Sequence, residues 1–125
     1  PQFWGPLVAN LAASNQGRGF RWASGTAPYS SMNTILPPNA EMCATFRDTG
    51  QGMLPPSSRH QGGVHVLMTD GAVRFITDSI EAGNSAAPTV MLGQTGPRAP
   101  GSISPYGLWG ALGTRAAREI TNTDF

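Results

Sequence analysis

Apolar residues alternate most clearly in the stretch from Val64 to Ile76, where two runs rich in β-branched and aromatic residues flank the dipeptide Asp70-Gly71. Both central positions of a type I′ turn need positive φ, which Asp tolerates and Gly adopts freely, so this pattern predicts a tight β-hairpin. A two-residue turn would place Thr69 opposite Ala72.

This register assigns the hairpin residues to two faces, because directly opposed residues of an antiparallel pair point to the same side. The face expected to pack on the core is mostly apolar and consists of Val64, Val66, Met68, Val73, Phe75 and Thr77. The other face is mixed, which fits a position under a loop or at an edge, and carries His65, Leu67, Arg74 and Ile76.

Helical spacing of apolar residues occurs near both ends of the chain. It predicts a short helix within residues 1–15 and a second over residues 106–112, with Gly113 where a helix end favours positive φ. Between them, Phe20 and Trp22 alternate with Arg21 and Ala23, which predicts a strand over residues 18–25.

The segment after the hairpin has the residues of a helix start. Asp78 or Ser79 can cap a short helical turn, and Glu81 then lies where a negative charge suits the helix dipole. The chain ends in a polar strand or tail from residue 115 to residue 125.

Composition favours irregular structure over long helices, since the 125 residues include 16 Gly and 11 Pro. Nine of the 11 Pro lie in two long connecting regions, residues 26–56 and 82–105. We therefore expect a mainly β fold with short helices (α+β), in which a small antiparallel sheet with a DG hairpin carries long Gly/Pro-rich loops. The length suits one domain over residues 1–125.

Charge and hydropathy limit the possible partners. A net charge of +1, with both signs scattered along the chain, gives no basic face for nucleic acid. No apolar run approaches the ~20 residues needed to cross a bilayer, so contact with a membrane would need a segment outside this chain, which begins at Pro1.

Groups for catalysis or metal binding are few. A nucleophile and base pair could only be Cys43 with His60 or His65, and no motif of a known enzyme class surrounds them, so we expect no enzymatic activity. A zinc site would draw on the same residues and Asp70, which lack a recurring ligand spacing. We expect no cofactor, although Ca²⁺ held by Asp70 and Asp78 stays open, and the candidate metal ligands are Asp70, Asp78 and His60.

The spacing of His60, nine residues and Asp70-Gly71 resembles the H-X9-DG signature of prepilin-type, processing-associated bacterial surface proteins. The similarity extends over Ser57 to Ile80 and Leu108 to Ala116, and upstream it includes Arg18 to Gly25 and Asn33 to Asn39. The chain departs from the family pattern at Ala117-Arg118 and in the longer 82–105 region. The residues that carry the motif are Arg59, His60, Gly62, Gly63, Asp70 and Gly71, and a structural role is favoured for them.

This resemblance implies an extracytoplasmic C-terminal domain, at the cell surface or in a periplasm-like compartment. The implied function is a non-catalytic structural or accessory subunit of a cell-surface filament, pseudopilus or envelope complex, with other protein subunits as partners. Trp4, Trp22 and Trp109 are interface candidates. The alternative is a small ligand- or metal-binding module centred on the His60/Asp70 region.

Overall fold

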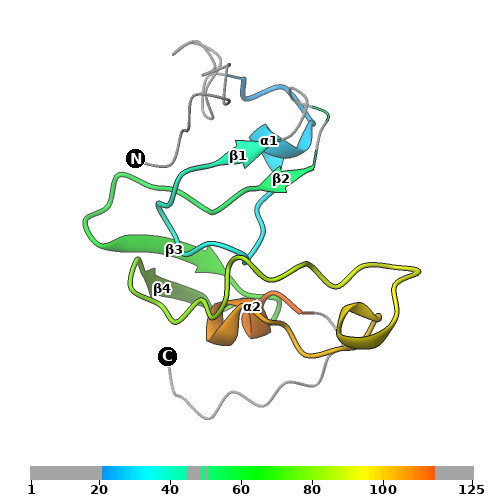
Figure 1. Cartoon of the computed structure of the whole chain (residues 1–125). Coiled ribbons are helices and arrows are strands. Elements are labelled where there is room, and N and C mark those ends of the chain that lie inside the picture. Colours follow the sequence, from blue (N-terminus) through cyan, green and yellow to red (C-terminus); the bar gives the residue numbers. More distant parts are fainter. Residues whose placement is uncertain (1–20, 45–48, 50, 115–125) are drawn as a thin grey trace, which may run out of the picture.

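The computed structural model describes residues 21–44, 49 and 51–114. These residues form a small α+β fold whose regular structure is mainly β, with two separate two-stranded antiparallel sheets (Figure 1). The elements in chain order are α1 (Ala27–Ser30), β1 (Cys43–Ala44), β2 (Gly52–Met53), β3 (Gly63–Leu67), β4 (Val73–Thr77), the 3-10 helix η3 (Gly96–Arg98) and α2 (Gly107–Leu112). The expected fold class is confirmed.

Strands β3 and β4 form the predicted hairpin, but their register differs from the prediction by one residue. Leu67 lies opposite Val73 and Val64 lies opposite Ile76. The Met68 N–H donates to the Ala72 carbonyl at 2.8 Å, so three residues connect the strands where two were expected.

The turn geometry explains this difference. The Gly71 N–H donates to the Met68 carbonyl at 3.0 Å, and Gly71 has φ +88°, whereas Asp70 is not among the residues with positive φ. A type I′ turn would need positive φ at both positions. The observed connection is the three-residue kind, in which a turn is followed by a left-handed glycine that forms a bulge.

The extra residue reverses the faces of β4. Val64 and Val66 are buried, as predicted for β3, but in β4 it is Ile76 that is buried, at 3% exposure. Val73 and Phe75, which were expected in the core, are 63% and 46% exposed. The predicted core face is therefore correct for β3 and wrong for β4, because a shift of one residue moves every side chain of a strand to the opposite face.

Helix α2 forms over residues that the apolar spacing of 106–112 predicted to be helical, and it completes the core. Trp109 packs against Val64, Val66 and Ile76 on the inner face of the hairpin. Four half-buried hydrophobic residues surround this cluster: Met68, Ile80, Ala82 and Leu112. The expectation for Gly113 is wrong, since its φ is −91° and the helix ends there without a left-handed residue.

The region 26–56, expected to be a long connection with local turns, contains α1, β1 and β2. Strands β1 and β2 are only two residues long and pair Cys43 with Met53. Asn33 is hydrogen bonded to β2 and the residue that follows it. Its side-chain amide donates to the Gly52 carbonyl at 2.8 Å, and its side-chain oxygen accepts the Leu54 N–H at 3.1 Å.

Two further expectations are corrected. Residues 21–24 form a turn closed by the Ser24 N–H on the Arg21 carbonyl at 3.0 Å, so the described part of the expected 18–25 segment is not a strand. Residues 77–80 form a single turn rather than a helix start. The expected helix within residues 1–15 and the expected strand or tail over 115–125 lie outside the described residues.

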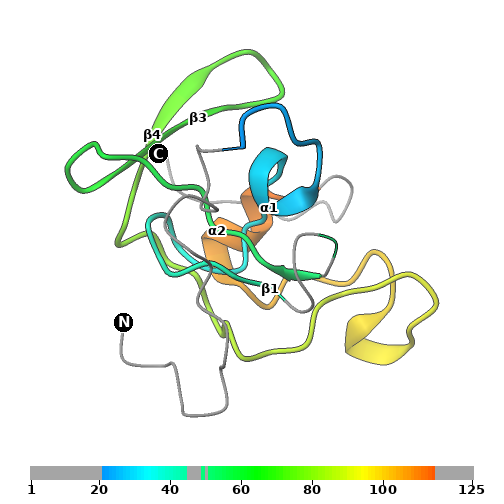
Figure 2. The ribbon, with the colours of Figure 1, turned by 90° about the horizontal axis from the view of Figure 1, so that it is seen from above.

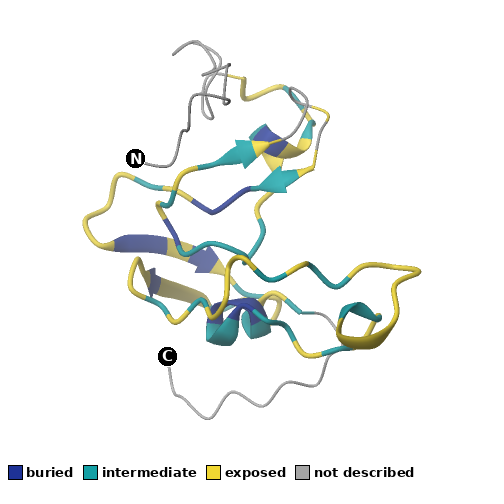
Figure 3. Ribbon diagram, viewed as in Figure 1, coloured by how far each residue is buried: buried dark blue, intermediate teal, exposed yellow. Residues whose placement is uncertain are grey.

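The region 82–105 projects away from the hairpin in both ribbon views (Figures 1 and 2). Its regular structure is limited to η3, and most of it is exposed, in contrast to the buried positions on β3 and α2 (Figure 3). The Arg98 side chain donates to the Thr89 carbonyl at 3.3 Å, and the backbone carbonyl of Arg98 accepts the Met91 N–H at 3.1 Å. These bonds close the excursion on itself.

Candidate functional site

The residues of the His60 and Asp70 motif lie at opposite ends of the hairpin. His60 precedes β3 and Asp70 follows it, and a five-residue strand at about 3.3 Å per residue is roughly 16 Å long. The motif therefore describes the two ends of one supersecondary unit and does not form a single pocket.

At the turn end, Asp70 and Gly71 shape the connection between β3 and β4. The Asp70 carboxylate accepts the Ala72 N–H at 2.8 Å, and Gly71 supplies the left-handed backbone of the bulge. Turns of this kind are stabilised when an Asp or Asn side chain accepts the backbone N–H of the residue two positions later.

At the other end, two glycines shape the approach to β3. Gly62 has φ +81° and its carbonyl accepts the Asp78 N–H at 2.9 Å. A Cβ at Gly63 would overlap the Ile76 carbonyl across the sheet, so this position needs glycine for close approach. The Ser58 hydroxyl donates to the Gly63 carbonyl and accepts the His60 N–H, both at 3.0 Å.

Asn39 joins this end of the hairpin to the preceding loop, a role that the sequence did not reveal. Its amide donates to the Asp78 carboxylate at 2.7 Å, and its side-chain oxygen accepts the Ser58 N–H at 2.8 Å. Its φ is +60°, a conformation in which Asn is enriched among non-glycine residues. An Asn directly after Pro37-Pro38 was the available signal.

The outer face of the hairpin carries aromatic and apolar side chains. The ring of His65 lies 5.0 Å from that of Phe75 and 5.4 Å from that of His60. On the same side of the next pair, Leu67 is 70% exposed opposite Val73. We call His65, Leu67, Val73 and Phe75 the outer face.

The candidate metal ligands Asp70, Asp78 and His60 are not brought together. Asp70 and Asp78 flank the whole of β4, and Asp78 is hydrogen bonded to Asn39. No group of three or more His, Cys, Asp and Glu that could hold a metal ion occurs within residues 21–44, 49 and 51–114. Cys43 lies in the other sheet, opposite Met53.

The three interface candidates have different surroundings. Trp109 is 2% exposed, and its indole N–H donates to the Leu36 carbonyl at 2.8 Å, so it is a core residue and its assignment to an interface is corrected. Trp22 is 91% exposed. Trp4 lies outside the described residues.

A cavity of about 330 Å³ lies between the segment 33–35, the excursion and α2. Its lining surface is mainly apolar, with hydroxyl groups from Ser, Thr and Tyr side chains, and none of its lining residues is charged. The sequence did not indicate it, because its walls come from segments without a shared motif.

Tyr106 also lines this cavity and fixes the excursion. Its hydroxyl donates to the Ala87 carbonyl at 2.9 Å, and burial raises the pKa of the phenol above its usual value.

In the described part of the chain, no helix is long and apolar enough to span a membrane.

The model of the family SBP_bac_10, described as a protein of unknown function (DUF1559), matches residues 4–83. Comparison with curated proteins and with solved structures gave no match.

Proposed function

The chain belongs to the SBP_bac_10 family, whose model covers more than half of it, and we propose that it is a non-catalytic structural or accessory subunit of a bacterial surface assembly. The assembly would be a cell-surface filament, a pseudopilus or an envelope complex. Its partners would be other protein subunits, in an extracytoplasmic compartment.

One observation carries the proposal: large apolar side chains lie on both faces of the hairpin. Its inner face is filled by Trp109, while its outer face leaves Leu67 and Val73 exposed. Exposed apolar side chains that lie next to one another mark surfaces for contact with another protein. In addition, neither β3 nor β4 pairs with a further described strand, so each has an edge where an extended segment could add.

The narrower assignment to prepilin-type proteins rests on sequence. The spacing of His60 and Asp70-Gly71 resembles the H-X9-DG signature, and the turn between β3 and β4 accounts for Asp70 and Gly71 by a structural need. A turn that folding explains supports a shared fold with that family. It gives no reason to assign a reaction.

The test compares two leucines that are both exposed, Leu67 on the outer face and Leu92 on the excursion. Leu67→Asp should reduce the fraction of the full-length protein in envelope or filament complexes several-fold, as measured by gradient fractionation of cross-linked cells. Leu92→Asp is the matched control and should assemble normally. Unfolding curves of both variants should match the unsubstituted protein.

A full-length protein that stays monomeric and is missing from every envelope fraction would contradict the proposal. Equal assembly of both aspartate variants would remove the outer face as the interface.

A further inference from the structure

The two histidines of the chain lie together on the outside of the hairpin. Their ring centres are 5.4 Å apart and their planes are at 85°, so neither ring stacks on the other. Both residues are exposed, and they are the only histidines in the 125 residues. This pairing comes from different elements, since His65 is in β3 and His60 is in the loop before it.

This spacing matches that of two imidazoles bound to one metal ion. With metal–nitrogen distances of about 2.0–2.1 Å and a tetrahedral angle, two such rings have centres roughly 5 Å apart. Because both side chains are exposed, small rotations about their side-chain torsions can direct one nitrogen of each ring to a shared ion.

The backbone holds the pair in place. The His60 N–H is bound to the Ser58 hydroxyl, which also donates to the Gly63 carbonyl at the start of β3. Phe75 lies against His65 on the neighbouring strand, 5.0 Å between ring centres. A site that is ordered before the ion arrives loses less conformational entropy on binding.

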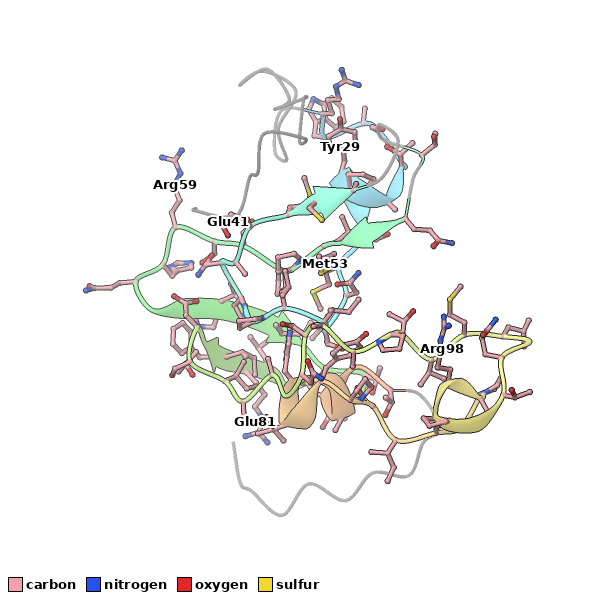
Figure 4. All side chains as sticks on the ribbon, in the orientation of Figure 1. Tyr29, Glu41, Met53, Arg59, Glu81 and Arg98 are labelled. Atoms are coloured by element: carbon pink, nitrogen blue, oxygen red, sulfur yellow. The ribbon has the colours of Figure 1, made fainter. Side chains whose placement is uncertain are left out.

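The surrounding charges leave the pair accessible to a cation. The Arg59 side chain extends away from the hairpin (Figure 4). Asp78, which follows β4 at the same end of the hairpin as His60, is hydrogen bonded to Asn39. Imidazole ligands suit Zn²⁺, Ni²⁺ and Cu²⁺, whereas Ca²⁺ and Mg²⁺ prefer oxygen.

We propose that His60 and His65 form a two-imidazole binding site for a late first-row divalent metal ion. The described residues supply only these two ligands, so water or a side chain of a neighbouring protein takes the remaining positions. The site does not depend on the proposed assembly function, and it differs from a site built on Asp70 and Asp78.

The test is calorimetric titration of the untagged full chain with Zn²⁺ and Ni²⁺. We expect one ion per chain and no binding of Ca²⁺ or Mg²⁺. Mutation of residues that only orient metal ligands typically lowers metal affinity 10–100-fold. Since His60 and His65 are the proposed ligands themselves, His60→Gln and His65→Gln should each weaken binding about tenfold or more.

Gln61→Ala and Cys43→Ser are the controls and should bind as the unsubstituted chain does. A Cu²⁺ spectrum should show two coupled imidazole nitrogens, and one in either glutamine variant. Because His65 contacts Phe75 in the sheet, circular dichroism is used to check that the His65→Gln variant is folded. His60 lies in the loop before β3, so His60→Gln tests the site without changing a strand residue. Unchanged affinity in His60→Gln, loss of binding in Cys43→Ser, or no binding to the unsubstituted chain would overturn the proposal.

Discussion

The carboxylate of Glu81 accepts the backbone N–H of Leu108 at 2.7 Å and so caps helix α2 from a segment 27 residues earlier in the chain. The backbone carbonyl of Glu81 accepts the next N–H, that of Trp109, at 2.9 Å. The N-cap residue Tyr106 makes no side-chain capping bond. Glu81 therefore supplies the acceptors that a helix start needs, and it fixes Trp109 over the hairpin.

Removing this cap should destabilise the whole fold. Glu81 also accepts the Gly83 N–H at 2.7 Å, so Glu81→Ala leaves two backbone donors without their acceptor and should cost about 1–2 kcal/mol in the free energy of unfolding. The measurement is urea denaturation followed by Trp fluorescence.

Glu81→Gln is the matched variant, because one amide oxygen can keep one of the two bonds. It should lose less stability than Glu81→Ala. Equal stability of Glu81→Ala and the unsubstituted chain would show that the cap contributes nothing.

The sequence predicted the hairpin but not its register, and the reason is local. Asp70-Gly71 is compatible both with a two-residue turn and with a three-residue connection that begins at Thr69. The choice depends on whether Val73 and Phe75 or Ile76 fill the space under Trp109, and this requires the position of α2. Only the folded packing supplies that information.

Alanine substitutions on β4 distinguish the two registers. Ile76→Ala should cost roughly 2–5 kcal/mol because it removes a buried side chain from the Trp109 cluster. Phe75→Ala should cost clearly less, since that ring is half exposed. Chemical denaturation of both variants measures the difference, and a larger loss for Phe75→Ala would favour the two-residue turn.

Gly71→Ala tests the bulge. Nothing lies within 4 Å of a Cβ at this position, so its cost comes from the backbone alone, and at φ +88° we expect roughly 1–2 kcal/mol. Gly71→Asn should cost less, since Asn tolerates the left-handed region better.

Gly25→Ala is the control for this comparison. Its Cβ also meets nothing within 4 Å, and its φ is not in the left-handed region. Its midpoint of thermal unfolding should equal that of the unsubstituted chain. A similar fall in both alanine variants would contradict a conformational cause at Gly71.

Other features could not be predicted, either because the element is very short or because its partners are distant in sequence. Strands β1 and β2 have two residues each, too few for an alternating pattern to be recognised. The helical spacing predicted the helix at Trp109, but its burial depends on contacts with Val64 and Ile76. The pairing of His60 with His65 likewise depends on how the loop before β3 returns over the strand.

Tyr106 should make stability fall at alkaline pH. Burial raises the pKa of its phenol in the folded state above the ordinary value near 10, so the unfolded chain loses its proton first as the pH rises. The stabilising contribution is complete below pH 10 and is lost as the pH rises through the folded-state pKa. All eight cationic residues are Arg, so no lysine contributes to the pH dependence of stability in this range.

The variant Tyr106→Phe keeps the ring and removes both the titration and the hydrogen bond to Ala87. At pH 7 it should be about 1 kcal/mol less stable, from the lost bond. Between pH 9 and pH 11 its urea midpoint should change less than that of the unsubstituted chain, so the two curves converge. Tyr29→Phe should keep the steep alkaline loss. If Tyr106→Phe and the unsubstituted chain instead lose stability in parallel over this range, the buried phenol is not the source of the alkaline loss of stability.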